Sequence, residues 1–363
     1  MTFAFEKRKT VSRTAIVVVP FVSFIASLLL TGLLLLAFGA DPVATFSAMF
    51  KGAFGSGRAF TETLVKAIPL MLTGLGVALA FKLKFWNIGA EGQLTLAGVA
   101  ATWVAIFWAK WLPAPLVLPL VILVGCAAGA LWAGIPALLK TSLKVDETLV
   151  TLMLNYVAIL LSQFLYYGPW RDPKGFGFPG TEMFPKAAWF PRLAGRAHIG
   201  LYFALVAAAV LWFVLQRTRW GFELKVIGSS PKAARYQGIA VERNILLAVL
   251  LSGALCGLAG VGEVAGISRR LQQGLSLGYG YTAIIVAWMA QLNPLAIPFV
   301  AVLMGGLLVG GDQVQMVMGL PSSMGLLMQG MMLFPMLAGS LFTEYRIKRI
   351  GAQASRETER GVA

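Results

Sequence analysis

The sequence has little charge for its length. Asp, Glu, Lys and Arg make up 12% of its 363 residues, and 58% of the residues are hydrophobic. A soluble domain carries about 25% charged residues, and the mean hydropathy of this chain is +0.79. So much apolar surface cannot be buried in one water-soluble core, which excludes an ordinary soluble protein.

Side chains that carry out chemistry are also scarce. The chain has one histidine, His198, and two cysteines, Cys126 and Cys256, and no His or Cys pair stands at metal-ligand spacing. Both cysteines lie in apolar stretches, where a thiol usually behaves as a small hydrophobe. The Gly-x-x-x-x-Gly-Lys-Ser/Thr loop that cradles phosphates is missing. We therefore expect no catalytic residue, metal or cofactor in this chain, and any ATP to be bound by another chain.

The sequence does contain long uncharged runs. Residues 15–40, 111–139 and 281–311 each exceed the roughly 20 residues that cross a bilayer. These runs predict an all-α polytopic membrane protein of about ten transmembrane helices. We place the helices at residues 15–38, 64–81, 87–108, 115–138, 147–167, 199–216, 244–266, 279–292, 294–311 and 323–343.

The basic residues indicate which side of the membrane each loop occupies. The formal charge is +15, but Lys and Arg are scattered at helix ends rather than in a stripe between aromatics, which disfavours nucleic acid as a partner. With ten spans, 19 of the 30 basic residues fall on one side, and the positive-inside rule makes that side the cytoplasm. We expect cytoplasmic tails at residues 1–14 and 344–363 and a transmembrane domain at 15–343.

Two long loops follow from this topology. The external loop, residues 168–198, is rich in Pro, Gly and aromatics, which suits either a compact interfacial cap, touched by a delivery protein, or a plain connection. The cytoplasmic loop, residues 217–243, contains a short predicted helix at 231–236, with Pro231 at its start and Gly238 after its end. Such a helix is either a docking element for a soluble partner or a segment that rests on lipid headgroups.

The segment FWNIGAEGQ, residues 85–93, places polar groups at the start of an apolar span. Ionisable groups at membrane depth are costly and mark function by default. Asn87, Glu91 and Gln93 therefore either line a polar path or hold neighbouring helices together. Both interpretations stay open at this stage.

The segment DETLVTLMLNYVA, residues 146–158, begins with Asp146 and Glu147, which suit a helix N-terminus without any further function. Asn155 and Tyr156 lie two to three turns deeper, where they make interhelical hydrogen bonds or line the path. Glu263, at the end of a glycine-rich helix, is a further candidate for the path.

A weak internal echo pairs residues 87–89 with residues 276–278. Each triplet ends in Gly, follows a basic pair and precedes an apolar segment of small residues. The two basic pairs fall on opposite sides in the ten-span topology. This is the pattern of an inverted repeat, whose interface carries the substrate site in many transporters, and chance similarity between Gly-rich helices explains it as well.

Four segments resemble one family in order along the chain: FWNIGAEGQ, DETLVTLMLNYVA, GSSPKAARYQGI and GYGYTAIIVAWMAQLNP. The family is that of permease subunits of ABC importers of the ribose and branched-chain amino acid type, in the branch that serves nucleosides with basic-membrane-protein-like binding lipoproteins. The similarity runs from about residue 64 to residue 336.

The resemblance implies a bacterial inner-membrane permease that pairs with a second permease, identical or homologous. It also implies two cytoplasmic ATPase subunits, which would bind ATP and Mg²⁺, and an extracytoplasmic solute-binding protein. The segment that enters the ATPase groove would comprise Gly228, Ser230, Pro231, Ala233, Ala234, Arg235, Tyr236 and Gly238.

Other functions stay open beside the nucleoside importer. Related permeases carry simple sugars or flavins. An ion-coupled secondary transporter would need carboxylates deep in several spans, and here only Glu91 and Glu263 qualify. A membrane enzyme or a structural scaffold is disfavoured because no convergent catalytic set of residues is visible.

Overall fold

The computed structural model describes residues 2–7, 13–175, 177–275, 277–319, 327, 330–331, 334–335, 338–339 and 345–350. The chain divides into two compact units. Unit 1 comprises residues 1–49 and 311–363, and unit 2 comprises residues 50–310.

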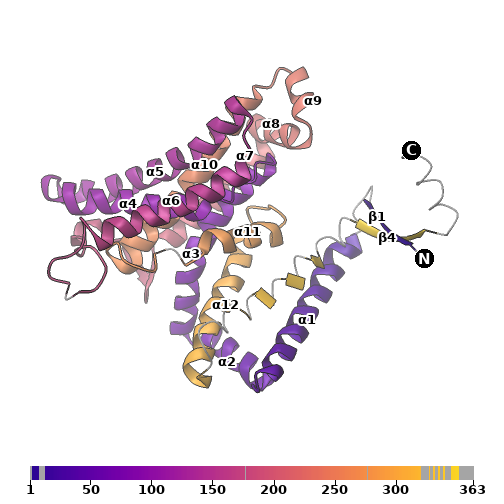
Figure 1. Ribbon diagram of the computed structural model, residues 1–363, viewed down its shortest axis with the longest axis horizontal. Helices are drawn as coiled ribbons and strands as arrows, with labels where there is room; N and C mark the ends of the chain where they lie inside the picture. Colours follow the sequence, from indigo (N-terminus) through magenta and orange to yellow (C-terminus); the bar gives the residue numbers. More distant parts are fainter. Residues whose placement is uncertain are drawn as a thin grey trace. The chain divides into compact units, whose positions relative to one another are not determined.

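Helices make up most of the described chain (Figure 1). The α-helices are α1 (Arg13–Ala37), α2 (Pro42–Phe54), α3 (Gly57–Lys82), α4 (Ala90–Trp103), α5 (Ala114–Leu143), α6 (Glu147–Tyr167), α7 (Gly200–Arg217), α8 (Arg219–Ser229), α9 (Pro231–Tyr236), α10 (Val241–Val261), α11 (Tyr279–Met289) and α12 (Ile297–Met318). π-Helical turns extend α4 (Val104–Trp108) and α10 (Gly262–Ser268), and 3-10 turns occupy Ala109–Trp111 and Lys186–Ala188. The strands are β1 (Thr2–Lys7), β2 (Arg192–Ala194), β3 (Ala197–His198) and β4 (Tyr345–Ile350).

The predicted all-α polytopic fold is confirmed. Among the described residues, seven helices are long and apolar enough to cross a membrane, or eight if α1 and α2, bent by 116°, count as one span. The span predicted at 279–292 is wrong as a complete span. Helix α11 has 11 residues and covers about 16 Å, roughly half of a 30 Å hydrocarbon core. The span predicted at 323–343 lies largely outside the described residues.

Helices α5 and α10 pack backbone to backbone in the centre of unit 2. Gly125 and Gly129 of α5 meet Gly253 and Gly257 of α10, where a Cβ on Gly129 would lie 2.8 Å from the Cα of Gly257. Both helices thus carry a Gly-x-x-x-Gly pattern at the contact. In lipid, where burial gives helices little driving force to associate, such close approach supplies the van der Waals contact instead.

Two non-helical segments of unit 2 each end at a helix N-terminus. Residues 83–89 follow α3 and end at Gly89, the N-cap of α4. Residues 269–275 and 277–278 follow the π-helical end of α10 and end at Gly278, the N-cap of α11. Gly89 and Gly278, which end the two predicted triplets, thus each directly precede a helix, and the inverted repeat stays a prediction.

Unit 2 has two distinct ends. At one, here called the cap end, the loop between α6 and α7 packs on the segment after α10, through Thr181 N–H to Leu271 O (2.8 Å) and Phe184 N–H to Arg269 O (2.8 Å). At the other, the α9 end, α8 and α9 project beyond the bundle (Figure 1). The described residues of 168–198 therefore form a packed cap rather than a plain connection.

Unit 1 contains a strand from each end of the chain. Strand β1 pairs antiparallel with β4 from Thr2 opposite Ile350 to Lys7 opposite Tyr345. Paired strands outside the bilayer must lie on the same side of it, so this pairing places residues 2–7 and 345–350 together.

Candidate functional site

Glu91 joins the N-termini of α4 and α11. It lies in the first turn of α4, and its carboxylate accepts hydrogen bonds from the backbone N–H groups of Gly278 (2.8 Å) and Gly280 (2.5 Å). The side chain is 1% exposed. The N-termini of α4 and α11 thus converge on one buried carboxylate, and the positive end of each helix dipole stabilises its charge. Gly280 has no room for a Cβ, because the backbone of Ala90 and Glu91 lies against it.

Asn87 and Gln93 form a buried pair of carboxamides beside Glu91. Asn87 Oδ1 accepts from Gln93 Nε2 (2.9 Å) and from the backbone N–H of Gly89 (3.0 Å). Asn87 Nδ2 donates to Gln93 Oε1 and to Ser252 Oγ on α10, both at 3.2 Å. These bonds hold residues 87–93 in their irregular course and tie them to α10.

Asn155 ties the same segment to α6. Its Oδ1 accepts from Gly92 N–H (2.8 Å), and its Nδ2 donates to Ile88 O (2.9 Å) and to the hydroxyl of Tyr281 (3.2 Å). Four of the predicted path residues, Asn87, Glu91, Gln93 and Asn155, are therefore brought together; we call these four the polar junction. Sequence reasoning missed Tyr281 and Ser252, which lie in helices that are mainly apolar.

Two predicted path residues lie elsewhere. Tyr156 is 55% exposed, because neighbouring positions of a helix point about 100° apart and it therefore lies outside the buried face that carries Asn155. Glu263 is buried in the π-helical end of α10, and Gly262 beside it lies against the ring of His198, near the cap end. The acidic start of α6 agrees with its predicted local role. Asp146 is the N-cap, and its hydrogen bond from Leu149 N–H holds the pKa of that carboxyl below its usual range, while Glu147 forms an ion pair with Lys140.

The polar junction is built to hold backbone rather than to react. Its carboxylate and carboxamides are turned mostly toward N–H and C=O groups of residues 88–92 and 278–280. Irregular backbone at membrane depth is tolerated only where such partners satisfy it. The arrangement can therefore fix, or release, the relative position of α4, α6 and α11.

The short helix predicted at residues 231–236 is present as α9. Ser230 caps it by accepting from Ala233 N–H (3.3 Å), and Pro231 occupies its first turn. Ala234 is fully buried, whereas Tyr236 is 94% exposed. Gly228, at the end of α8, packs against the carbonyl of Lys82. A surface for a partner at this end therefore has to be formed by the exposed residues Lys232, Ala233, Arg235 and Tyr236.

Comparison with known proteins identifies the family. Residues 59–337 match the family described as "Branched-chain amino acid transport system / permease component". The glucose ABC transporter permease protein TsgB13 of Haloferax volcanii is 36% identical over 354 residues, which is 94% of this chain and 92% of the relative. The guanosine ABC transporter permease protein NupP of Bacillus subtilis is 33% identical, over 86% of this chain and 90% of the relative. The nucleoside ABC transporter permease protein NupB of Lactococcus lactis is 32% identical, over 82% and 85%.

These relatives and the apolar helices make the chain a multi-pass protein of the bacterial inner membrane. The match covers most of the chain and most of each relative, so it concerns the whole membrane domain and not a shared fragment. The chain belongs to the permease component family of branched-chain amino acid transport systems and is an ABC transporter permease.

Proposed function

We propose that this permease forms the translocation path of an importer for a nucleoside, delivered by an extracytoplasmic binding protein. The observation that carries the proposal is the agreement of two relatives, at 33% and 32% identity, whose names specify guanosine and nucleosides. A simple sugar is the second candidate, because a relative at 36% identity is named for glucose. A flavin has weaker support, from a probable riboflavin import permease of Treponema pallidum at 27% identity.

A second, different permease completes the proposed membrane channel. Bacillus subtilis has the guanosine permease proteins NupP and NupQ, to which this chain is 33% and 26% identical. Lactococcus lactis has NupB and NupC, at 32% and 27%, and Haloferax volcanii has TsgB13 and TsgC13, at 36% and 30%. In each organism the chain is more similar to one member of the pair, which supports a heteromeric permease in which it takes that member's place.

The proposed cytoplasmic partner is an ABC ATPase, which would bind ATP and Mg²⁺ and carry out hydrolysis, so this chain needs no ATPase site of its own. The proposed contact is α9, which projects from the bundle with an exposed aromatic and exposed basic residues at its surface. Tyr and Arg are enriched among residues that dominate binding energy at protein interfaces. In this arrangement the tails 1–14 and 344–363 lie in the cytoplasm, and residues 15–343 form the permease domain with α9 in its cytoplasmic loop.

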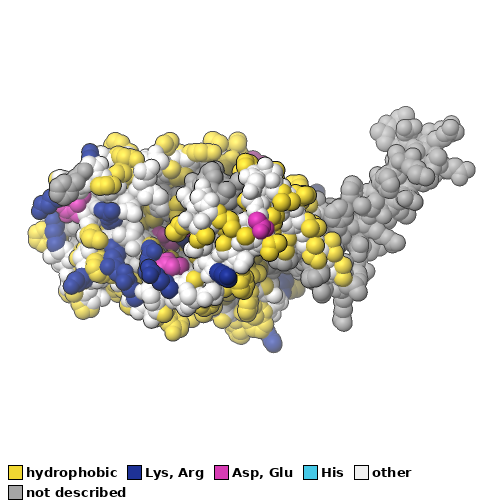
Figure 2. Space-filling model, turned by 90° about the horizontal axis from the view of Figure 1, so that it is seen from below, with side chains coloured by type: hydrophobic (Ala, Val, Ile, Leu, Met, Phe, Trp, Pro, Cys, Tyr) yellow, Lys and Arg dark blue, Asp and Glu magenta, His cyan; other side chains and the backbone are white. Residues whose placement is uncertain are grey.

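The cap end is the proposed contact for the binding protein. Five of its basic residues are exposed, whereas only two acidic residues lie in the same loop, Asp172 and Glu182. Figure 2 shows Lys and Arg side chains on the face seen from below, with some Asp and Glu side chains among them. An acidic surface on the partner would be steered to the exposed basic residues of the loop at low ionic strength. The exposed basic residues of the loop are Arg171, Lys174, Lys186, Arg192 and Arg196.

Uptake by proteoliposomes tests this function. The permease is reconstituted with the second permease, the ABC ATPase and the binding protein of its source organism, and ATP-dependent uptake of radiolabelled guanosine, glucose and riboflavin is measured. We expect guanosine uptake that stops without ATP or without the binding protein. Uptake of glucose alone would replace the nucleoside assignment with the sugar assignment, and uptake that persists without the ATPase but needs an ion gradient would overturn the importer.

A further inference from the structure

One face of α6 is buried and almost entirely polar. The buried residues of this helix recur every three or four positions and therefore lie on one face. From Glu147 to Tyr166 they extend over about 28 Å, close to the 30 Å hydrocarbon core of a bilayer. Most exposed residues of the helix, such as Leu149, Leu160 and Phe164, are apolar. We call the buried face the α6 seam; its residues are Glu147, Thr151, Asn155, Ala158, Ser162 and Tyr166.

The half of the α6 seam toward the α9 end is occupied by backbone. Glu147 Oε1 accepts from Trp86 N–H (3.4 Å), and Thr151 Oγ1 accepts from Ile88 N–H (3.3 Å). Asn155 accepts from Gly92 N–H (2.8 Å). The polar groups here are used to hold residues 86–92, so this half of the seam is closed.

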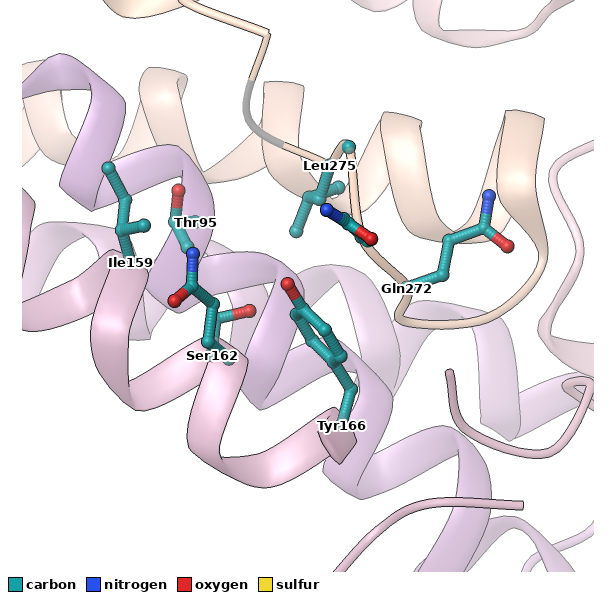
Figure 3. Close-up of a pocket in the computed structure, with 9 residues that line it drawn as sticks. Thr95, Ile159, Ser162, Tyr166, Gln272 and Leu275 are labelled. Carbon is teal, nitrogen blue, oxygen red and sulfur yellow. The ribbon is translucent and has the colours of Figure 1, made fainter. Parts of the chain in front are cut away.

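The half toward the cap end opens into a cavity of about 330 Å³. Figure 3 shows Ser162 and Tyr166 projecting from α6 toward the segment that bears Gln272 and Leu275, with Thr95 of α4 at the far side. None of the nine described residues that line the cavity is charged; they are Thr95, Ile159, Ser162, Gln163, Tyr166, Gln272, Gln273, Gly274 and Leu275.

Hydroxyls and carboxamides at membrane depth are unusual away from a path or an interhelical contact. Gln163 and Gln273 are exposed, so the Gln163 carboxamide and the Gln273 amide N–H₂ can reach a solute in the cavity. The carboxamide oxygen of Gln272 accepts from Arg270 Nε (2.6 Å), and that of Gln273 accepts from the hydroxyl of Tyr167 (3.2 Å). Neutral groups that both donate and accept match the hydroxyls of a sugar ring, and one aromatic wall suits its apolar face. A charged solute would find no counter-charge among the lining residues, and 330 Å³ lies within the range of small-molecule sites.

We propose that this cavity is an outward-facing site of the permease that binds the sugar ring of the transported solute, above the closed half of the α6 seam. The proposal rests on the proposed function and adds a recognition site within the permease itself. The ring could belong to a free hexose or to the ribosyl group of a nucleoside, and both present the same array of hydroxyls.

Protection of a cysteine tests the site. In the assembled transporter in right-side-out vesicles without ATP, Ser162→Cys is treated with a small membrane-impermeant methanethiosulfonate. The parent chain, which contains Cys126 and Cys256, gives the background. We expect Cys modification to slow at least threefold with millimolar guanosine and free ribose if the ring is ribosyl, or with glucose if it is a hexose. Adenine, which lacks the ring, should not protect.

Ala114→Cys is the matched control, because Ala114 is exposed at the start of α5 and does not line the cavity. It should react without protection by any solute. Ser162→Leu, which fills the cavity, should reduce uptake at least fivefold, whereas Ser162→Thr, which keeps the hydroxyl, should retain most of it.

An unreactive cysteine at position 162, or one that no sugar-bearing solute protects, overturns the site, and so does normal uptake by Ser162→Leu. Uptake by the parent transporter is measured in the same preparation. If it takes up guanosine or glucose with ATP while the cavity variants behave like the parent chain, the site is wrong and the importer stands. If the parent transports neither solute, the proposed function fails instead.

Discussion

Glu91 illustrates how a charge is kept at membrane depth. Its carboxylate accepts two backbone N–H groups at the start of α11, and hydrogen bonds to a charged group contribute about 1.5–3 kcal/mol each. In Glu91→Gln the amide N–H₂ would face one of these donors, so we expect a loss of about 2 kcal/mol. Thermal unfolding in detergent should show a midpoint lower by several degrees. Glu182→Gln, in the exposed loop, is the control and should unfold like the parent.

His198 predicts a pH dependence of stability. Burial lowers the pKa of this histidine to about 4, against a usual value near 6.5, so the folded chain keeps it neutral. The free energy of unfolding has its full value above pH 6.5. It falls as the pH decreases from 6.5 to 4, because over this range the unfolded chain binds a proton that the folded chain does not. The free energy of unfolding decreases by about 3 kcal/mol in total.

The measurement for His198 compares thermal unfolding at pH 7.5 and pH 4.5 in the parent and in His198→Gln. The parent should lose more stability on acidification than the variant, whose side chain stays neutral. Equal losses in both would show that carboxyl groups, and not the histidine, set the acid sensitivity.

The sequence identified the members of the polar junction but not their partners. Asn87, Glu91, Gln93 and Asn155 could be predicted because amides and a carboxylate stand out in apolar runs. Glu91 accepts hydrogen bonds from the backbone N–H groups of Gly278 and Gly280. Every residue type except proline has such a group, so no particular side chain in the sequence predicts this contact. Polarity alone does not distinguish Tyr156 from Asn155. The recurrence of polar residues at positions 151, 155, 162 and 166 does, because these positions share one helix face and 156 lies outside it.

At the scale of elements, the contact between α5 and α10 depends on glycine. A Cβ on Gly129 would meet the carbonyl of Gly253 and the Cα of Gly257, so Gly129→Ala should force the helices apart and cost about 1–3 kcal/mol. Gly57→Ala is the matched control, since its surroundings leave open space. Unfolding in detergent and retention of monodisperse protein measure the effect. Equal stability of the two variants would show that the helix pair is held by other contacts.

Helices α9 and α11 differ in how well their ends can be predicted from the sequence. Ser230, Pro231 and Gly238 mark the ends of α9, and these caps are local, so its bounds follow from residues 230–238 alone. Helix α11 begins after a segment of bends and turns, at residues 269–275 and 277–278, and ends inside the uncharged run 281–311. Its start is fixed by Glu91, which lies 187 residues away from Gly278. Hydropathy cannot distinguish this arrangement from a full span.

Tyr236 tests whether α9 couples the permease to the ATPase. An aromatic that is 94% exposed at the tip of α9 suits an interface anchor, and truncation of such an anchor costs about 2 kcal/mol or more. Tyr236→Ala should weaken ATPase binding to the permease about 30-fold, measured by titration of the purified ATPase. Phe178→Ala, 71% exposed at the cap end, should bind normally. Ala234 is a poor choice for this test, because its burial makes any larger residue disrupt the loop itself.

At the scale of the whole molecule, the distribution of basic residues predicts that both ends of the chain are cytoplasmic, and the pairing of β1 with β4 requires that the two ends lie on the same side. Ala4 stands opposite Lys348 in this pairing, at a separation of about 5 Å between Cα atoms. Cysteines at these two positions should therefore form a disulfide on mild oxidation. A pair at Ala4 and Lys174, which lies in the cap, is the control and should not.

Cysteine labelling then determines on which side of the membrane the two ends of the chain lie. In right-side-out vesicles an impermeant maleimide should leave Ala4→Cys and Lys348→Cys unmodified until detergent is added, and should modify Lys174→Cys at once. The same reasoning applies to α9, because α7 is the one membrane-spanning helix between the cap and α9, so Lys232→Cys should be protected like the two ends. If position 232 and position 174 react alike from outside, α7 does not cross the bilayer. In that case α9 could not reach a cytoplasmic ATPase, and the proposed route of coupling would fail with the topology.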